Sequence, residues 1–189
     1  MTRLSAIPSS CTMGTLVELL THRAQSQPDQ IAFTFLSDGE TEAGNLTYSE
    51  LHQAACRLAV RLQELNLAGE RALILHSPGF DYLIALFGCW YAGVVAVPAY
   101  PPRNQRNAGR IQSVAADAQI SAILTENQKV AKTCQWLEPV LDVERLHWLT
   151  PEVDAKVSAD RWEYPSIHSD TLALLQYTSG STGTPKGVM

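Results

Sequence analysis

Residues 82–102 read YLIALFGCWYAGVVAVPAYPP, and this uncharged stretch decides how the rest of the chain is interpreted. Its length is sufficient for a helix that crosses a bilayer. Gly88, Gly93 and Pro98 interrupt the stretch, however, and the β-branched segment 94–97 follows a helix-like one. A buried helix that stops at a glycine and leads into a buried strand explains this order better than a membrane helix, which is the alternative.

The same alternation of helix and short apolar strand continues on both sides of this stretch. Helices are predicted over 15–27, 47–65, 81–92, 107–118 and 126–141, and strands over 31–36, 72–75, 94–97, 120–125, 146–149 and 172–177. Two polar stretches, 37–45 and 150–170, are predicted to be connections. This order predicts an α/β fold with a largely parallel sheet and flanking helices.

One predicted helix start has a specific signature. Thr47 and Glu50 have the spacing of a capping box, in which each side chain accepts a hydrogen bond from an unpaired backbone N–H of the first turn. Apolar residues then recur at helical spacing, namely Leu51, Ala54, Ala55, Leu58, Leu62 and Leu65. This periodicity predicts a helix with one buried face that ends before Gly69.

The overall composition limits the functions that are possible. The 189 residues are 46% hydrophobic and 17% charged, which argues against a disordered chain. A net charge of −5 argues against a nucleic-acid or anionic-membrane partner, because no excess positive charge is available to bind phosphates. The four cysteines, Cys11, Cys56, Cys89 and Cys134, show no metal-binding spacing, and the N-terminus lacks the apolar segment of a signal peptide. We therefore expect a cytoplasmic protein.

The chemistry of the chain is concentrated in its last segment, TSGSTGTPKG (178–187), which follows the apolar segment 172–177. Glycines allow backbone N–H groups to approach an anion closely, and hydroxyl groups donate hydrogen bonds to phosphate oxygens. Lys186 adds a positive charge. Because open α/β sheets bind ligands beyond the carboxyl ends of their strands, we predict that this loop binds an anion with several oxygens, such as a triphosphate.

Other known loops do not fit this segment. A Walker loop requires glycine immediately before the lysine, where Pro185 stands here. The dinucleotide pattern G-x-G-x-x-G and the hydrolase pattern G-x-S-x-G are both absent from the sequence. The alternative without a binding role is a flexible Ser/Gly linker. The predicted apolar strand before the loop and Pro-Lys-Gly at its end argue against such a linker.

The segment 178–187 resembles the phosphate-binding signature of the adenylate-forming enzymes. Two longer segments, 88–119 and 170–189, are most similar to the fatty acyl-AMP ligases, particularly at Pro101-Pro102-Arg103 and Gln176-Tyr177. Amino-acid-activating members more often carry a lysine before the alanine-glycine pair and aspartate-proline after the proline, where Tyr91 and Tyr100-Pro101-Pro102 stand here. The resemblance extends over nearly all of the chain from about Thr15 onward.

This resemblance implies a two-step ligase that uses ATP and Mg²⁺. A fatty acid would be converted to an acyl-adenylate with release of pyrophosphate, and the acyl group would pass to the phosphopantetheine of an acyl carrier protein, often to load a polyketide or lipopeptide assembly line. An acyl-CoA ligase that uses coenzyme A, or a noncatalytic truncated fragment, are the alternatives. The triphosphate would be lined by Thr178, Ser179, Gly180, Ser181, Thr182 and Gly183. Lys186 would support the loop or the leaving pyrophosphate.

The resemblance also implies that residues 1–189 are an incomplete N-terminal part of an AMP-binding domain, ending just after the phosphate-binding loop. No metal ligand is assigned within the chain, since the acidic magnesium ligand of this family would come later. The subfamily marker that separates fatty acyl-AMP ligases from acyl-CoA ligases would also lie beyond residue 189.

Several other residues have both a functional and a structural interpretation. Arg103, Arg106 and Arg110 would contact a carrier protein or phosphate, although a solvated loop and helix face is favoured. His76 ends a predicted strand beside a turn, which would allow a place near the ligand crevice. A structural role without contact to a ligand is the favoured interpretation of this histidine. Cys89 is expected in the core rather than in the wall of an acyl tunnel. We expect the same of Trp90, and Cys56 is expected to pack beside an apolar helix face.

Overall fold

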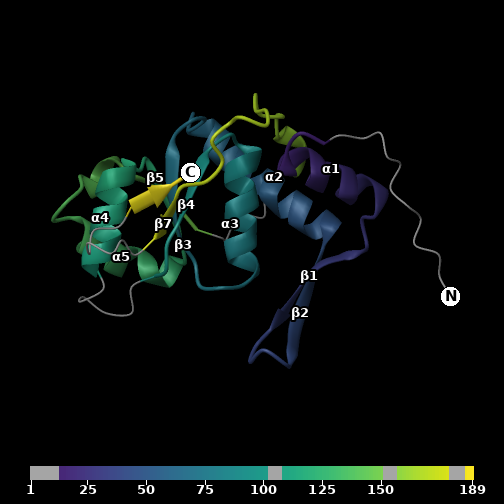
Figure 1. The fold of residues 1–189 in the computed structure, drawn as a ribbon, viewed down its shortest axis with the longest axis horizontal. Helices are drawn as coiled ribbons and strands as arrows, with labels where there is room; N and C mark the ends of the chain where they lie inside the picture. Colours follow the sequence, from purple (N-terminus) through teal and green to yellow (C-terminus); the bar gives the residue numbers. More distant parts are fainter. Residues whose placement is uncertain (1–12, 102–107, 151–156, 179–185) are drawn as a thin grey trace.

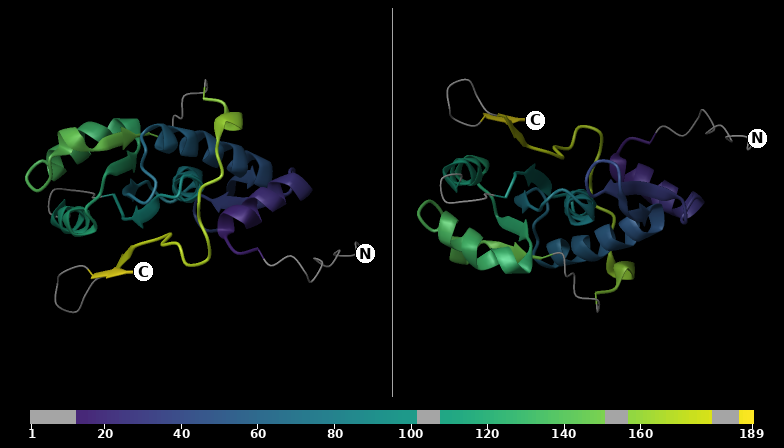
Figure 2. Two further views of the ribbon diagram at one scale, coloured as in Figure 1. Left: turned by 90° about the horizontal axis from the view of Figure 1, so that it is seen from above. Right: turned by 90° about the horizontal axis from the view of Figure 1, so that it is seen from below.

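A four-stranded parallel sheet with helices on both faces forms the centre of the molecule (Figures 1 and 2). The computed structural model describes residues 13–101, 108–150, 157–178 and 186–189. The sheet has the strand order β4-β3-β5-β6, made of β3 (Arg71–Leu75), β4 (Val95–Pro98), β5 (Ala122–Thr125) and β6 (His147–Leu149). All neighbouring pairs in it are parallel. The predicted α/β class with a parallel sheet is therefore confirmed.

The helices are divided between the two faces of this sheet. One side carries α1 (Leu16–Ser26), α2 (Tyr48–Glu64) and α3 (Phe80–Tyr91), and the other carries α4 (Ala108–Ala118) and α5 (Val130–Leu137) (Figure 2). The described residues also include short 3-10 turns, namely η2 (Asn127–Lys129), η3 (Val143–Arg145) and η4 (Ala159–Arg161). The result is a three-layer arrangement with a separate hydrophobic core on each side of the sheet.

The alternation of side chains along the central strand explains why there are two cores. Ala72 and Ile74 of β3 pack with α2 and α3, whereas Leu73 and Leu75 pack with α4 and α5. All four side chains are buried. Successive residues of a strand point to opposite faces, so a strand that is covered on both sides consists of consecutive apolar residues.

Helix α2 begins where the sequence predicts it to begin. The backbone N–H of Glu50 donates to Thr47 Oγ1 at 3.2 Å, and that of Thr47 donates to Glu50 Oε2 at 2.8 Å. Both bonds of the predicted capping box are thus present. The apolar face behind it, which includes Leu51, Ala55 and Leu58, is buried against α3 and the sheet.

Helix α3 ends at the predicted glycine. Gly93 has φ of +68°, a left-handed conformation that favours glycine. The backbone N–H of the following Val94 donates to Cys89 O at 2.9 Å, which closes the last turn before β4 begins. None of the helices in the described part of the chain is long and apolar enough to cross a membrane.

Gly88 allows α2 and α3 to approach each other closely. A Cβ atom at this position would lie 2.5 Å from Leu58 Cδ2 and 3.0 Å from Leu58 Cβ. We expect Gly88→Ala to lower the free energy of unfolding by about 1–3 kcal/mol, since an extra methyl group in a packed core displaces its neighbours. Urea unfolding measures this change, with the exposed Gly109→Ala, where a Cβ meets nothing within 4 Å, as the control. Equal midpoints for the two variants would contradict this prediction.

An antiparallel hairpin of β1 (Ile31–Leu36) and β2 (Glu42–Thr47) extends away from the helices (Figure 1). The prediction that 37–45 is only a polar connection is therefore wrong for residues 42–45, which belong to β2. Strand β2 lacks the apolar alternation by which a strand is recognised, and its backbone pairing with β1 defines it. The turn before it is closed by Asp38, whose pKa is lowered to about 2 by hydrogen bonds from the backbone N–H groups of Thr41 and Glu40.

Two other predictions also differ from the structure. The predicted helix over 126–141 consists of η2 and α5 and ends at Leu137, because Pro139 has no backbone N–H with which to continue it. The predicted surface connection over 150–170 contains a packed residue. Trp162 Nε1 donates to Tyr91 O at 2.7 Å, and the two rings lie 4.8 Å apart.

Candidate functional site

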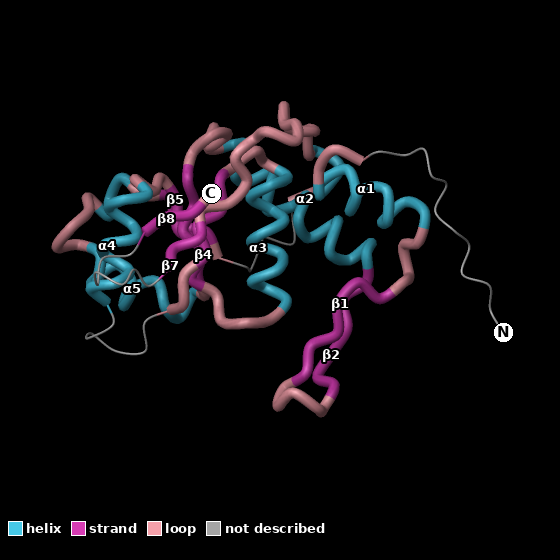
Figure 3. The backbone as a smooth tube through the Cα atoms, viewed as in Figure 1, coloured by secondary structure: helices cyan, strands magenta, loops and turns pink. Residues whose placement is uncertain are grey.

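Two short strands form the stem of the predicted phosphate-binding loop. Strand β7 (Gln176–Thr178) pairs antiparallel with β8 (Lys186–Val188), so that Thr178 lies opposite Lys186 in the backbone register (Figure 3). The structure therefore brings the first and last predicted site residues together. The others, Ser179, Gly180, Ser181, Thr182 and Gly183, lie outside the described residues, and Lys186 is placed by its backbone position in β8.

The stem is attached to the edge of the parallel sheet. Leu174 forms an isolated parallel bridge with Ala96 of β4. The backbone N–H of Ala96 donates to Ala173 O at 3.0 Å, and that of Leu175 donates to Ala96 O at 2.9 Å. The predicted strand over 172–177 is thus only partly right, because its first half follows β4 and its second half pairs with β8. The loop consequently starts beside the carboxyl end of β4, at the edge where open α/β sheets place their ligands.

A cavity of about 670 Å³ lies beside the stem. Its walls come from the ends of β3 and β4, from α4 and from β7, and they include His76, Pro98, Arg110, Ile111 and Tyr177. The cavity lies within the size range of small-molecule sites in proteins. The predicted loop site therefore has a cavity beside it, and the sequence analysis did not predict this cavity.

His76 lines this cavity. The interpretation that places it near a ligand crevice stays a prediction. The side chain is 4% exposed, and its Nδ1 has no hydrogen-bond partner among the described residues. Burial lowers the pKa of His76, although the nearby carboxyl groups of Asp81 and Glu126 act in the opposite direction. A buried neutral imidazole is therefore expected at this sheet edge.

A second polar cluster at the same edge was missed by the sequence reasoning. Lys129 Nζ donates to Glu126 Oε1 at 2.6 Å and to Ser77 Oγ at 3.1 Å. The hydrogen bond from Lys129 lowers the pKa of Glu126. The signal for this cluster is that Ser77 closely follows β3 and Glu126 directly follows β5, and parallel strands end at a common edge.

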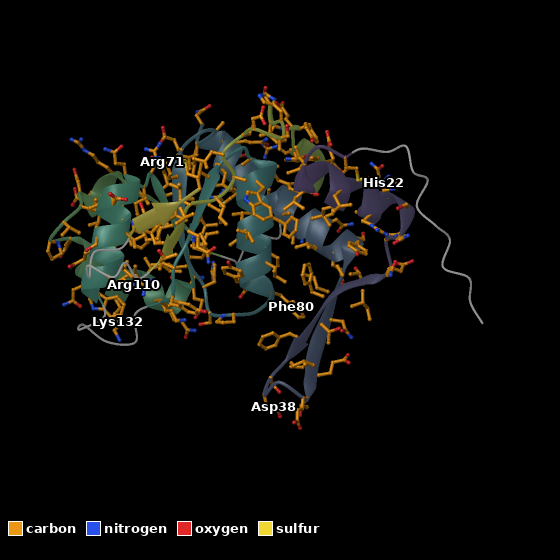
Figure 4. The ribbon with its side chains drawn as sticks, in the orientation of Figure 1. His22, Asp38, Arg71, Phe80, Arg110 and Lys132 are labelled. Carbon is orange, nitrogen blue, oxygen red and sulfur yellow. The ribbon has the colours of Figure 1, made fainter. Side chains whose placement is uncertain are left out.

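Of the three arginines that the sequence analysis singled out near α4, the structure describes Arg110. Arg103 and Arg106 lie outside the described residues. Arg110 is exposed, as the favoured interpretation expects, and lies on α4 near the C-terminal strands (Figure 4). Its Nη2 also donates to Tyr177 O at 3.3 Å, so this guanidinium contacts the stem of the loop.

The buried cysteines have packing roles, as the sequence predicts. Cys56 and Cys89 are 2% and 0% exposed, and burial raises the pKa of each thiol to about 12. Cys56 Sγ lies 3.7 Å from His52 Nε2, but the thiolate that a nucleophile requires is not available at such a pKa. His52 Nδ1 is instead within hydrogen-bond distance of Tyr91 Oη, at 3.0 Å.

These pKa values predict the order of alkylation of the three described cysteines. At pH 8 in the folded protein, iodoacetamide is expected to label the half-buried Cys134 first, because Cys56 and Cys89 combine burial with a raised pKa. Peptide mass spectrometry of a time course measures the rates, and labelling in urea provides the unfolded reference. Labelling of Cys56 as rapid as that of Cys134 would contradict this prediction.

The described residues also bear on possible metal sites. Among residues 13–101, 108–150, 157–178 and 186–189, no group of three or more His, Cys, Asp or Glu side chains is arranged to hold a metal ion.

Comparison with known proteins gives a consistent result. Residues 20–189 match the AMP-binding enzyme family. The medium-chain-fatty-acid–[acyl-carrier-protein] ligase JamA of Moorena producens is 43% identical over 180 residues, which cover 93% of this chain and 30% of JamA. The putative fatty-acid–CoA ligase fadD25 of Mycobacterium tuberculosis is 35% identical over 193 residues, which cover 95% of this chain and 32% of fadD25.

A similar fold occurs in a solved structure. The crystal structure of a fatty acyl-adenylate ligase from L. pneumophila, in complex with acyl adenylate and pyrophosphate, superposes with a TM-score of 0.79 and 33% sequence identity. The match covers 94% of this chain and 30% of that structure, so the chain spans about a third of the length of the proteins it matches. On the match over residues 20–189, the chain belongs to the family of AMP-binding enzymes.

Proposed function

We propose that this protein activates a fatty acid with ATP and then transfers the acyl group to an acyl carrier protein. In the first step a carboxylate oxygen attacks the α-phosphorus of ATP, the bond to the β-phosphate oxygen breaks, and pyrophosphate leaves. In the second step the phosphopantetheine thiol loses its proton and attacks the acyl carbonyl carbon, and AMP leaves. ATP supply and acyl carrier proteins are both found in the cytoplasm, where we place this reaction.

One observation carries this proposal. The loop rich in glycine and hydroxyl groups has its two ends joined by β7 and β8, and the residues just before β7 are bonded to Ala96 of β4 in the parallel sheet. A triphosphate bound there would meet several hydrogen-bond donors at once. Fixed donors of this kind stabilise the charge that develops on phosphate oxygens during transfer.

The proposed roles of the loop residues follow from their chemistry. Thr178, Ser181 and Thr182 offer hydroxyl donors, as does Ser179, while Gly180 and Gly183 allow backbone N–H groups to reach the phosphates. Lys186 would neutralise the charge of the leaving pyrophosphate. Mg²⁺ would supply further charge neutralisation between the phosphates, and no described residue is assigned to it as a ligand.

The choice of acyl acceptor rests on the relatives. JamA, at 43% identity, is named as a medium-chain fatty acid ligase for an acyl carrier protein, which supports a carrier protein and a medium-chain acid here. The relative fadD25 is named as a putative fatty-acid–CoA ligase, which keeps coenzyme A as the second candidate. We also propose that residues 1–189 are part of a longer adenylation domain, since these relatives are about three times longer than the region matched.

The experiment uses the full-length protein that contains these residues. The protein is incubated with ATP, Mg²⁺ and fatty acids of increasing chain length, and mass spectrometry detects acyl-AMP. Coenzyme A or a phosphopantetheinylated carrier protein is then added in parallel samples. Acyl-AMP followed by an acylated carrier protein supports the proposal, and acyl-CoA in its place identifies the second candidate. Absence of acyl-AMP with every acid would contradict adenylation and favour a noncatalytic role.

A further inference from the structure

Tyr177, the residue before Thr178 at the start of the loop, joins the stem to helix α4. Its hydroxyl donates to Asp117 Oδ2 at 2.6 Å, and its carbonyl accepts from Arg110 Nη2 at 3.3 Å. Asp117 and Arg110 lie on the same helix, about two turns apart. The side chain and the backbone of one residue are thus held by two charged groups of α4.

The ring of Tyr177 also contacts the other strand of the stem. Tyr177 lies opposite Gly187 in the β7–β8 register, and a Cβ atom at Gly187 would lie 3.2 Å from Tyr177 Cζ. The ring therefore lies against the backbone of β8, one residue beyond Lys186. Tyr177 is buried, and burial together with the contact to Asp117 raises the pKa of its phenol to about 12. The hydroxyl consequently keeps its proton and can donate to Asp117 throughout the physiological pH range.

The chain just before the stem has an attachment of its own, at Ala173, four residues before Tyr177. Ala173 O accepts from the backbone N–H of Ala96 at 3.0 Å and from Trp90 Nε1 at 2.8 Å. This attachment fixes the chain before the stem to β4 and α3. The contacts of Tyr177 with α4 add a second point of attachment, which lies within the stem itself.

We infer that Asp117 and Tyr177 are positioning residues for the phosphate-binding loop, with α4 as the support that sets the direction of its stem. This inference rests on the proposed function, because it assigns the two residues to the binding of ATP. Neither residue needs to touch the nucleotide. A loop that binds phosphates through fixed donors loses affinity when its base can tilt, since small displacements weaken several hydrogen bonds together.

The test in the full-length protein combines two single variants with their double variant. We expect Tyr177→Phe and Asp117→Ala each to raise the KM for ATP about five- to tenfold in ATP–pyrophosphate exchange, because each removes the same hydrogen bond to a carboxyl group. The double variant should be no worse than either single one, and Asp117→Asn, whose amide oxygen still accepts, should stay near wild type. The KM for the fatty acid should not change.

Two matched controls lose the same groups elsewhere. Tyr164→Phe removes the hydroxyl of an exposed tyrosine and Asp29→Ala removes an exposed carboxyl, and both should leave the KM for ATP unchanged. A wild-type KM for ATP in Tyr177→Phe, additive effects in the double variant, or a fall in kcat with an unchanged KM for ATP would overturn the inference. The last of these results is what a merely structural role would produce.

A second measurement separates this inference from the proposed function. Hydrogen exchange followed by mass spectrometry reports on residues 176–189 whether or not the protein makes acyl-AMP. We expect Tyr177→Phe to speed amide exchange in this segment about tenfold while β3 and β5 stay protected, since the lost bond anchors only the stem. Unchanged exchange in residues 176–189 would overturn the inference even if adenylation is confirmed. Faster exchange in a protein that makes no acyl-AMP would contradict only the proposed function.

Discussion

Replacing Lys186 by alanine is expected to lower fatty-acid-dependent ATP–pyrophosphate exchange about 10²–10³-fold in the full-length protein. Loss of one preorganised charged donor typically weakens transition-state stabilisation by about 2.7–4 kcal/mol. Lys186 opens β8, opposite Thr178. In the proposed mechanism its charge neutralises the phosphates that leave as pyrophosphate. Exchange of labelled pyrophosphate into ATP measures the effect directly, because it reports only on the adenylation step.

The matched control for this variant is Lys132→Ala. Lys132 is an exposed lysine on α5 whose ammonium lies 5.0 Å from the centre of the Trp136 ring. Its loss should leave the exchange rate unchanged, and both variants should unfold at the temperature of the wild type. Normal exchange in a folded Lys186→Ala protein would remove this lysine from the proposed mechanism.

A polypeptide restricted to residues 1–189 is expected to form no acyl-adenylate from ATP and a fatty acid. The described residues contribute the stem of the loop, and the chain spans about a third of the length of its relatives. Correct positioning of two reactants contributes about 7–11 kcal/mol to well-oriented reactions. A loop that binds phosphates without groups to hold the adenine and orient the carboxylate does not supply that positioning. Mass spectrometry for acyl-AMP, with the full-length protein as the positive control, measures the result.

The same polypeptide is expected to self-associate. Leu172 and Val188, on either side of the loop, are 39% and 53% exposed, and Ile31 on the hairpin is 50% exposed. Exposed apolar side chains and unpaired strand edges both promote association. Size-exclusion chromatography with light scattering of the sample used for mass spectrometry gives the oligomeric state. A stable monomer that makes acyl-AMP would contradict both expectations and the proposal that these residues are part of a longer adenylation domain.

The elements that are local in sequence were predictable from the residues alone. The capping box of Thr47 and Glu50 and the glycine end of α3 at Gly93 depend on residues within one turn of each other. The buried strands β3 and β5 were recognisable because consecutive apolar residues identify a strand covered on both faces. Strand β2 was missed for the opposite reason, since its residues show no alternation and only pairing with β1 makes them a strand.

The composition of the predicted site was also readable in the sequence, because glycines, hydroxyl groups and a lysine within ten residues already indicate an anion site. Its support was decided by the tertiary structure. Asp117 meets Tyr177 across 60 residues of sequence. In the neighbouring polar cluster, Ser77 likewise meets Glu126 across 49 residues. No periodicity relates such pairs, since parallel strands and their crossover helices bring distant segments to one edge only after the sheet has formed. Local sequence therefore determined what the loop contains, and the assembled sheet and α4 determined where it is held.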